Sequence, residues 1–369
     1  MFIYQRADWP NFHWDTEQLL TPLATVLRKQ GRLLGHMAAL GFPLQTEAML
    51  QTLTLDVLKT SEIEGELLNA DQVRSSVARR LGIDTFGLVP ADREVEGVVE
   101  MLLDATQRFD APLTDERLFG WHAALFPTGR SGMHRITVGG WRTPEAGPMQ
   151  VVSGALGRER IHFQAPDAPA LTTEMRRFID WFNSDTPLDP VLKAAVAHLW
   201  FITIHPFDDG NGRIARAIAD LQLARADGSP QRFYSLSAQI RRERNAYYKQ
   251  LERSQRGDLD ITDWLRWFLA CLDRAITAAE TTLTSVLRKA RYWDWLNTKP
   301  LNARQRLLLN KLLDGFDGKL TTSKWAKIAK CSQDTALRDI QQLVDWGVLV
   351  REAAGGRSTN YNLSDVDEC

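Results

Sequence analysis

Residues 205–216 read His205-Pro206-Phe207-Asp208-Asp209-Gly210-Asn211-Gly212-Arg213-Ile214-Ala215-Arg216. The stretch before them, from Val191 to Ile204, has apolar residues at helical spacing and predicts a buried helix that ends near His205. A second helix is expected from about Arg213 through Leu223. The twelve residues therefore read as a loop that joins two helices.

This loop has the features of a polyphosphate site. Gly210 and Gly212 let the backbone approach a ligand closely, and the free N–H groups that open the next helix attract anions. Arg213 and Arg216 lie three apart on the first turn of that helix, so we expect both guanidinium groups on the anion side. Asp209 adds a hard oxygen ligand for a divalent cation that bridges the phosphates.

His205 is the one titratable group of the loop suited to accept a proton near neutral pH. The predicted chemistry is the deprotonation of a hydroxyl beside a magnesium-bound polyphosphate. The competing interpretation is an ordinary helix-loop-helix with a capping Asn211 and solvated arginines. That interpretation suits each residue taken alone, but a long motif with a role at every position favours the site.

The string resembles the signature of the Fic family, HPFxxGNGRxxR, at every position. The resemblance implies a protein adenylyltransferase that moves AMP from ATP, with Mg²⁺, to a Ser, Thr or Tyr hydroxyl of a target protein. It implies His205 as the general base and Asp209 as the magnesium ligand. It also implies phosphate binding by Gly210, Asn211, Gly212, Arg213 and Arg216. The motif leaves the attacked phosphorus open, because Fic relatives also transfer UMP or phosphocholine, or phosphorylate.

An upstream segment, Lys59-Thr60-Ser61-Glu62-Ile63-Glu64-Gly65-Glu66, ends an apolar run that predicts a helix stopped at Gly65. Thr60 and Glu64 are four apart and share a face. The segment resembles the Fic inhibitory helix, and this implies that Glu64 pairs with Arg216 and inhibits the enzyme in cis. The alternative is that Glu64, like its neighbours Glu62 and Glu66, is a solvated acid at a helix end.

Composition sets outer limits. The 369 residues are 44% hydrophobic with a formal charge of −1, so the chain is expected to be globular, with no global attraction to nucleic acid. The cysteines Cys271, Cys331 and Cys369 are scattered without CxxC spacing, which indicates a reducing compartment and no cysteine metal site. No leader is evident, and the longest apolar run is too short to span a bilayer. We therefore expect a cytoplasmic protein without a membrane partner.

The expected fold class is mainly α, a Fic-type helical bundle with a β-hairpin flap and a C-terminal winged helix-turn-helix domain. The predicted domains are an N-terminal helical region with the inhibitory helix (1–66), the catalytic core (67–297) and the winged helix-turn-helix (298–369). Helices are expected at 16–40, 44–64, 69–80, 92–110, 114–126, 237–253 and 263–287.

The flap is placed at about 141–165. Residues 150–153 and 160–163 flank Gly154-Ala155-Leu156-Gly157 and predict a hairpin. In Fic proteins a hairpin here holds the target by strand addition, which implies target docking by Val151, Val152 and Ser153. His162 lies on the same hairpin and is interpreted as a flap-surface histidine rather than a second base.

The stretch from Ser237 to Arg253 resembles the Fic helix that closes the nucleobase pocket. The resemblance implies that Tyr247 and Gln255 contact the base. Gln255 stands where relatives have Asn, and an aromatic ring stacks on any base, so the choice of nucleotide stays open. The alternative is that the tyrosines of this helix pack into the core.

Beyond Pro300, helices at 303–313, 322–329 and 332–345 and strands at 347–350 and 357–363 resemble a winged helix-turn-helix. Residues 301–364 hold ten Lys or Arg against six Asp or Glu, a local charge of +4, which permits DNA binding. The helix at 332–345 would be the recognition helix. The residues on it that would contact the edges of DNA bases are Gln333, Thr335, Arg338 and Gln341. Asp334 and Asp339 would oppose phosphates, so protein docking or dimerisation is an equal alternative.

Two functions follow. The first is an autoinhibited adenylyltransferase that uses ATP and modifies a protein target. The second is a DNA-binding regulator that uses the Fic core as a nucleotide sensor, with slow self-modification only. Removal of AMP from modified proteins is a further option in the first class. A homodimer is common in the family, and no residue here decides the oligomeric state.

Overall fold

Helices make up most of the computed structural model, which describes residues 1–83, 87–153, 160–313, 316, 318–352 and 359–364. The chain divides into two compact units: residues 1–84 and 88–282 form the first, and residues 85–87 and 283–369 form the second. The mainly helical class with small hairpins is confirmed. The sequence placed the last boundary at 297/298, whereas the second unit begins at Leu283, inside helix α11 (Thr262–Leu296).

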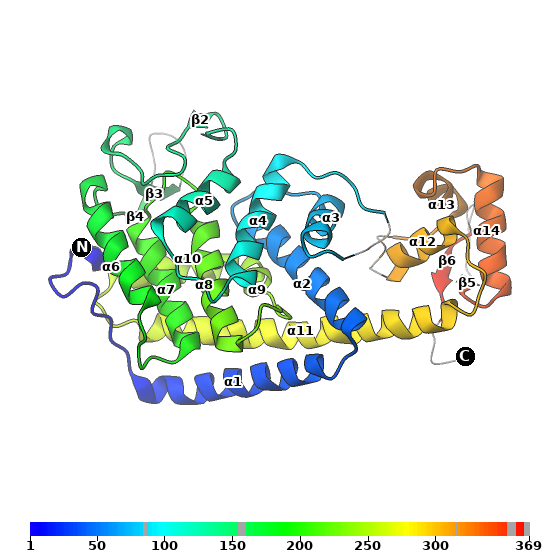
Figure 1. Cartoon of the computed structure of the whole chain (residues 1–369), viewed down its shortest axis with the longest axis horizontal. Coiled ribbons are helices and arrows are strands. Elements are labelled where there is room, and N and C mark those ends of the chain that lie inside the picture. Colours follow the sequence, from blue (N-terminus) through cyan, green and yellow to red (C-terminus); the bar gives the residue numbers. More distant parts are fainter. Residues whose placement is uncertain (84–86, 154–159, 314–315, 317, 353–358, 365–369) are drawn as a thin grey trace. The chain divides into compact units, whose positions relative to one another are not determined.

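The first unit is a helical bundle (Figure 1). Besides the first part of α11, its helices are α1 (Thr16–Ala38), α2 (Phe42–Ile63), α3 (Ala70–Arg80), α4 (Arg93–Gln107), α5 (Asp115–Leu125), α6 (Leu171–Asn183), α7 (Pro190–Ile204), α8 (Asn211–Asp227), α9 (Leu236–Arg242) and α10 (Arg244–Arg256). Short 3₁₀ turns occur at Ile3–Gln5, Pro144–Ala146 and Ala168–Ala170.

The core of this unit is the pair α7 and α8, which pack against each other in the middle of the bundle (Figure 1). Every residue of α7 from Val191 to Ile204 is buried, as expected for a helix that is apolar all round. The side chain of Asp189 caps its start, and Pro190 occupies the first helical position. The central pair thus holds the loop between its two helices in a fixed place.

Two predicted helix boundaries are wrong. The helix after the loop begins at Asn211 and not at Arg213, and it continues to Asp227. The predicted single helix over 237–253 is two helices, α9 and α10, which meet at Glu243. Both oxygens of Glu243 bind Arg274 of α11, at 2.5 and 2.6 Å, and this ion pair accompanies the break.

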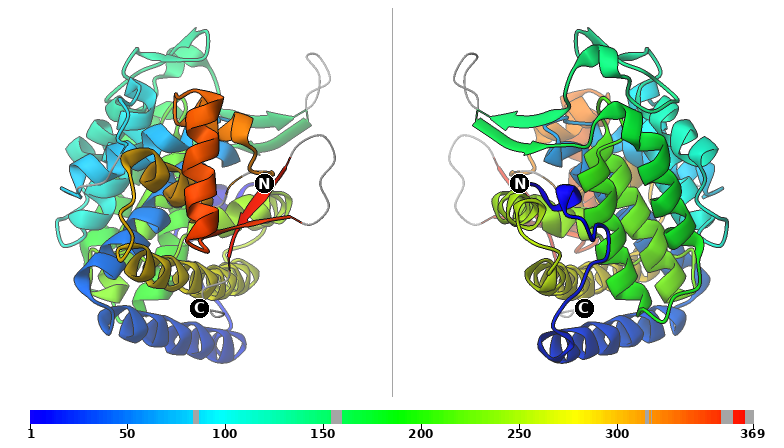
Figure 2. Two further views of the ribbon diagram at one scale, coloured as in Figure 1. Left: turned by 90° about the vertical axis from the view of Figure 1, so that its right-hand side faces the viewer. Right: turned by 90° about the vertical axis from the view of Figure 1, so that its left-hand side faces the viewer.

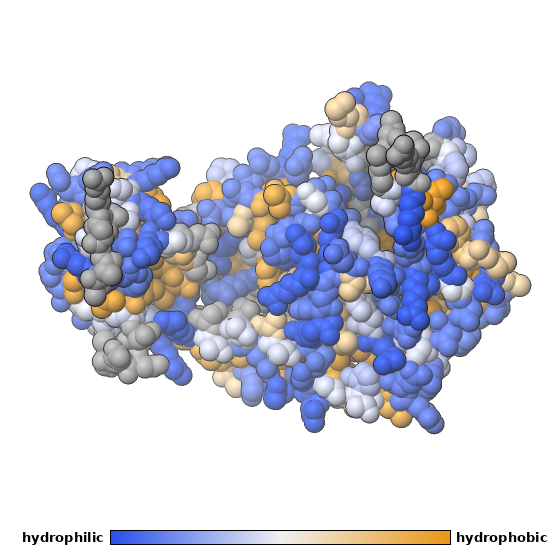
Figure 3. Space-filling model, turned by 180° about the vertical axis from the view of Figure 1, so that it is seen from behind, coloured by the Kyte–Doolittle hydropathy of each residue, from blue (hydrophilic) through white to orange (hydrophobic). Residues whose placement is uncertain are grey.

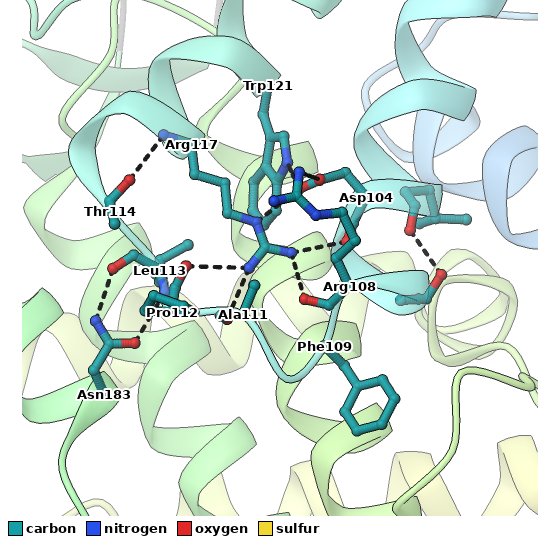
Figure 4. A network of polar contacts seen from close by, with 12 residues as sticks. Asp104, Arg108, Phe109, Ala111, Pro112, Leu113, Thr114, Arg117, Trp121 and Asn183 are labelled. Carbon is teal, nitrogen blue, oxygen red and sulfur yellow. Dashed lines mark hydrogen bonds and ion pairs between the residues drawn. The ribbon is translucent and has the colours of Figure 1, made fainter.

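Helix α5 is tied to α4 by a polar network around Asp104 (Figure 4). The carboxylate accepts hydrogen bonds from Arg117 Nε and Trp121 Nε1, both at 2.7 Å. Arg117 also donates to the carbonyl of Asp104 at 2.8 Å. His122 of α5 contacts the loop between α7 and α8. The network around Asp104 therefore fixes the position of a helix that packs against this loop.

Two antiparallel hairpins belong to the first unit. The short pair is β1 (Arg130–Ser131) with β2 (His134–Arg135). The longer pair, β3 (Gln150–Ser153) with β4 (Arg160–Gln164), extends away from the helices in both views of Figure 2. The strands of the predicted flap are therefore confirmed as a hairpin, whereas its turn, Gly154-Ala155-Leu156-Gly157, lies outside the described residues.

The second unit contains α12 (Ala303–Leu313), α13 (Thr322–Ile328), α14 (Gln333–Asp345) and the hairpin of β5 (Leu349–Arg351) with β6 (Tyr361–Leu363). The fully buried Trp325, Ile340 and Leu343 are part of its own apolar core. The predicted turn at Gly355-Gly356 falls outside the described residues. The order of elements agrees with the sequence, and both the winged helix-turn-helix assignment and DNA binding stay predictions.

One expectation about α14 is wrong. Asp339 does not face outward to oppose phosphates: its carboxylate is 5% exposed and binds Arg304 Nε at 2.8 Å and Asn302 Nδ2 at 2.9 Å. Gln333, Arg338 and Gln341 are exposed as predicted, and Thr335 is partly buried. Asp334 is therefore the one acid of the two considered that remains exposed on this helix.

Hydrophilic residues cover most of the face shown in Figure 3, and hydrophobic ones are scattered among them. Among the described residues, no helix combines the length and the apolar character needed to cross a bilayer.

Candidate active site

His205 occupies the end of α7 in the left-handed backbone conformation, with φ of 52°. Its ring Nδ1 lies 3.2 Å from the carbonyl of Ile202, so Nδ1 carries the proton and donates it. This leaves the lone pair of Nε2 free. Burial lowers the pKa of His205 to about 4, so the ring is neutral at physiological pH. His205 is thus set up to accept a proton at Nε2.

The loop after His205 is held in shape by Asn211. Its side-chain oxygen accepts the N–H of Phe207 at 3.0 Å, and its amide group donates to the Phe207 carbonyl at 2.8 Å. Both side-chain groups of Asn211 are therefore engaged within the loop, and its backbone N–H is the group left to face a phosphate. Asn211 was predicted to cradle phosphate, and its side chain supports the cradle indirectly.

His122 of α5 packs against the loop through Phe207 and Asp209. Its ring stacks on Phe207 with centroids 4.2 Å apart and planes at 7°. Its Nε2 lies 3.2 Å from the carbonyl of Asp209, and its Nδ1 accepts the N–H of Gly139 at 3.4 Å. Burial lowers the pKa of His122 to about 4, so this histidine is a neutral positioning residue rather than a second base.

The carboxylate of Asp209 borders the start of α8. Its Oδ1 accepts the N–H of Gly210 at 2.6 Å, and its Oδ2 accepts the hydroxyl of Ser131. Asp208 beside it accepts the N–H of Thr137 at 2.8 Å. An oriented carboxylate beside a helix N-terminus fits Mg²⁺, which in nucleotide sites takes one or two carboxylates together with phosphate oxygens.

The N-terminus of α8 is open toward the same space. No side chain caps it, and Gly210, with φ of 79°, is the residue before its first turn. A Cβ on Gly210 would stand 2.9 Å from the ring of Phe126, which explains why glycine is needed there. The uncapped N–H groups, together with the helix dipole, are suited to bind an anion.

Arg216 is 1% exposed and is bound by residues at the end of α2, the segment predicted to be inhibitory. Its Nε donates to Thr60 Oγ1 at 2.8 Å, and its Nη2 donates to the Thr60 carbonyl at 2.9 Å and to Glu64 Oε1 at 2.7 Å. Burial alone would lower the pKa of Arg216, but the charge of Glu64 offsets this and the pKa is raised. Its buried Nη1 has no hydrogen-bond partner in the described part of the chain.

Glu64 lies over the mouth of the anion site. It follows the last residue of α2, and Gly65 after it has φ of 91°, which turns the chain away. A Cβ on Gly212 would overlap Glu64 Oε1, so the carboxylate touches the bare backbone of the first turn of α8. Glu64 therefore occupies space that a phosphate at this helix end would need.

Glu66 also reaches the motif. Its Oε2 lies 2.5 Å from Arg213 Nη1, whose side chain is 3% exposed. Partial burial raises the pKa of Glu66, although the charge of Arg213 opposes this. Glu66 is not the freely solvated neighbour that the alternative interpretation assumed. Both motif arginines are thus bound by carboxylates from one short segment.

Part of this arrangement lines a pocket of about 680 Å³, a size usual for small-molecule sites, whereas the predicted phosphate-binding residues Gly210, Arg213 and Arg216 are not among its lining residues. The phosphate end is formed by Glu64, His205, Asp209, Asn211 and Gly212. The other walls come from the flap and from α10. The predicted residues Val151, Val152, Ser153, Tyr247 and Gln255 all line the same pocket.

Tyr247 and Gln255 are both buried. The hydroxyl of Tyr247 lies 2.9 Å from His198 Nε2, and burial raises the pKa of this tyrosine. The amide of Gln255 lies 3.4 Å from both the Ile202 carbonyl and Thr203 Oγ1. Tyr247 therefore packs into the core and also borders the pocket, so the two interpretations of this helix are compatible. Base contact stays a prediction.

Sequence reasoning missed several supporting residues. Glu66, Ser131, His122 and Arg142 each contact the motif from a distant segment, and Arg142 Nε donates to the His205 carbonyl at 2.9 Å. For Glu66 a signal was present, because it lies two residues after Glu64. For the other three, nothing in the local pattern marks the contact.

Comparison with known proteins gives two family matches. Residues 112–223 match the Fic/DOC family, and residues 2–83 match a domain of unknown function, DUF4172. The segment that carries the motif is therefore similar to the Fic/DOC family, the family that the sequence resembles.

Among curated proteins, the chain is 29% identical over 267 residues to protein adenylyltransferase fic-1 of Caenorhabditis elegans, which covers 71% of this chain and 47% of the relative. It is 38% identical over 125 residues to protein adenylyltransferase Fic of Nematostella vectensis, covering 32% of this chain and 27% of that protein. The chain spans less than half the length of these relatives. The relation to adenylyltransferases is distant.

Two solved structures share the fold. A Fic family protein from Desulfovibrio desulfuricans G20 superposes with a TM-score of 0.54 at 20% identity, over 95% of this chain and 97% of that one. A Fic domain containing signaling protein from Bacteroides thetaiotaomicron gives 0.51 at 21% identity, over 71% and 98%. At these identities the likeness concerns the fold alone.

Proposed function

We propose that the chain is a protein adenylyltransferase that inhibits itself in cis. In this proposal AMP passes from ATP to a hydroxyl of a target protein, and Glu64 keeps the enzyme off by holding Arg216. One observation carries the proposal: the Glu64 carboxylate bonds to Arg216 at 2.7 Å and lies against Gly212, at the helix end where a nucleotide phosphate would be bound.

The reaction follows from the groups around the pocket. A target hydroxyl beside His205 attacks the α-phosphorus of ATP, its proton passes to Nε2, and pyrophosphate leaves with the bonding electrons. The neutral ring has the correct protonation state before the step, because its pKa of about 4 keeps Nε2 unprotonated. The uncapped start of α8 and the two arginines would stabilise the charge of the phosphates.

Mg²⁺ would be held by Asp209 together with the phosphate oxygens, and when bound it would neutralise charge on the triphosphate. The unpaired Nη1 of Arg216 and Nε of Arg213 supply further donors inside the buried site. These two orphaned groups support a polyanion as the ligand, because buried donors normally have partners.

The flap suits a protein target. Within the described residues, β3 pairs with β4 alone, so its other edge is free to accept a strand. The side chain of Val152 is 48% exposed on this strand. A target segment could add to this edge by main-chain hydrogen bonds and bring its hydroxyl toward His205.

The proposed reaction is tested by the position of the label. With Mg²⁺ and a cell lysate as the source of hydroxyls, we expect the Glu64→Gly variant to transfer label from α-labelled ATP and not from γ-labelled ATP, and to release one pyrophosphate for each label transferred. Transfer from γ-labelled ATP would instead show phosphorylation. The absence of both transfer and ATP cleavage would contradict the proposal.

Replacement of Glu66 should give a smaller gain than replacement of Glu64. The Glu66 side chain is 47% exposed, and exposed ion pairs contribute little. We expect Glu66→Gln to raise the affinity for ATP by about two- to fivefold. Titration calorimetry at two salt concentrations measures it. An affinity equal to that of the wild type would mean that Glu66 does not compete with the nucleotide.

A further inference from the structure

Three side chains joined by hydrogen bonds lie on the flap side of the pocket. The hydroxyl of Ser153 on β3 is 2.6 Å from His162 Nε2 on β4, and His162 Nδ1 is 2.9 Å from Glu252 Oε2 on α10. The flap pairing places Ser153 opposite Arg160, so His162 is its diagonal neighbour across the two strands. The proposed target chemistry does not require this serine–histidine–glutamate arrangement.

Glu252 sets the direction of the hydrogen bonds that join Ser153, His162 and Glu252. Arg160 donates to this carboxylate at 2.8 Å, and Arg256 lies 3.7 Å from it. Burial alone would raise the pKa of Glu252, but the hydrogen bonds from His162 and Arg160 hold it below its usual value. Glu252 is thus an acceptor, so Nδ1 of His162 donates to it, and the neutral form of the ring offers the lone pair of Nε2. The hydroxyl of Ser153 then donates to His162.

A hydroxyl that donates to an imidazole, which in turn donates to a carboxylate, is the arrangement that activates a nucleophile. Three described residues with hydroxyl groups line this pocket: Ser153, Tyr247 and Tyr248. Tyr247 is buried, and burial raises the pKa of both tyrosines, which weakens them as nucleophiles. Tyr247 also contacts a histidine, His198, but Ser153 is exposed and is the one of the three whose histidine partner contacts a carboxylate in turn.

Ser153, His162 and Glu252 all line the same pocket as His205 and Asp209. Strand β3 is short, and Ser153 is three residues from Gln150, which also lines the pocket. An acceptor fixed in the protein needs no encounter with a second molecule, and such proximity raises rates greatly.

We propose that Ser153 is a self-modification site, at which the flap accepts the nucleotidyl group from the nucleotide bound in this pocket. The inference rests on the proposed function, because it needs an α-phosphorus open to attack. Ser153 Oγ forms a bond to that phosphorus, the bond to pyrophosphate breaks with its electrons on pyrophosphate, and the hydroxyl proton passes to His162 Nε2. The resulting imidazolium is stabilised by Glu252 and returns its proton to water.

The test is peptide mapping of the full chain. The Glu64→Gly variant is incubated with α-labelled ATP and Mg²⁺, and trypsin then releases the peptide of residues 143–158, whose hydroxyl residues are Thr143 and Ser153. We expect AMP on Ser153, located by fragmentation. Ser153→Ala should remove label from this peptide, Thr143→Ala should leave it unchanged, and His162→Gln should slow its appearance roughly a hundredfold.

The outcomes separate the two proposals. Release of pyrophosphate with label on other residues or other proteins, and none on 143–158, overturns the assignment of Ser153 and leaves the adenylyltransferase intact. If His162→Gln does not slow the appearance of label on Ser153, then His162 does not activate this serine. No transfer and no pyrophosphate overturns the proposed function, and the self-modification with it.

Discussion

Replacing His205 with alanine is expected to lower AMP transfer to other proteins by roughly 10²- to 10⁴-fold, the contribution usual for a positioned general base. The reason is geometric: Nδ1 donates to the Ile202 carbonyl, so Nε2 is the lone pair left for the target hydroxyl. The measurement is the rate of label transfer from α-labelled ATP to lysate proteins in the Glu64→Gly background, with label on the chain itself counted separately.

The affinity for ATP should change little in the same variant, because His205 is assigned to proton transfer and not to phosphate binding. Calorimetry therefore separates a lost base from a collapsed loop. The wild-type histidine should also leave a signature in the pH profile: with a pKa of about 4, the ring stays unprotonated through neutral pH, and the rate should fall only as the pH drops toward 4. Full transfer by His205→Ala would remove it as the base.

The motif itself was predictable from sequence because its residues are contiguous. His205, Asp209 and Arg216 lie in one loop and the helix that follows, so short chain connections keep them close together. The hairpin strands and most helices were equally visible from periodicity. The pairing of Glu64 with Arg216, implied by the family resemblance, has the predicted partners in the structure.

Contacts between distant segments were not visible. Ser131 reaches Asp209 across 78 positions, and Glu66 reaches Arg213 across 147. Local patterns say nothing of such pairs. The break at Glu243 and the burial of Asp339 have the same origin, since each acid binds an arginine of another helix, Arg274 or Arg304. Tertiary ion pairs overrode the expectation drawn from each helix alone.

Glu64→Gly is expected to raise the affinity for ATP and the rate of transfer by roughly ten- to hundredfold, the equivalent of one hydrogen bond between charged groups. Under the proposed function, the γ-phosphate would have to displace the carboxylate from Arg216 and from the backbone at Gly212 in the wild type. The variant removes that competitor. The measurements are the dissociation constant for ATP by calorimetry and the initial rate with α-labelled ATP.

Stability should move in the opposite direction when ATP is absent. Arg216 is 1% exposed, and without Glu64 its positive charge loses its carboxylate partner while keeping the two hydrogen bonds to Thr60. We expect the free energy of unfolding to fall by about 1–3 kcal/mol, because a buried charge has lost a partner. ATP with Mg²⁺ should restore it, since binding to the folded state stabilises by mass action. A variant equally stable with and without ATP would contradict the exchange of partners.

The matched control is Glu62→Gly, a change two residues earlier, in the last turn of α2. Glu62 binds Lys59 at 2.5 Å and Arg241 at 3.3 Å, and it does not contact Arg216. Both variants introduce glycine near the end of α2, and Glu62→Gly loosens the helix at least as much because Glu62 lies within it whereas Glu64 is its C-cap. If Glu64→Gly alone raises activity, the gain comes from freeing Arg216. If both variants raise the activity equally, mobility of the helix end relieves the inhibition. The ion pair between Glu64 and Arg216 would then not be its cause.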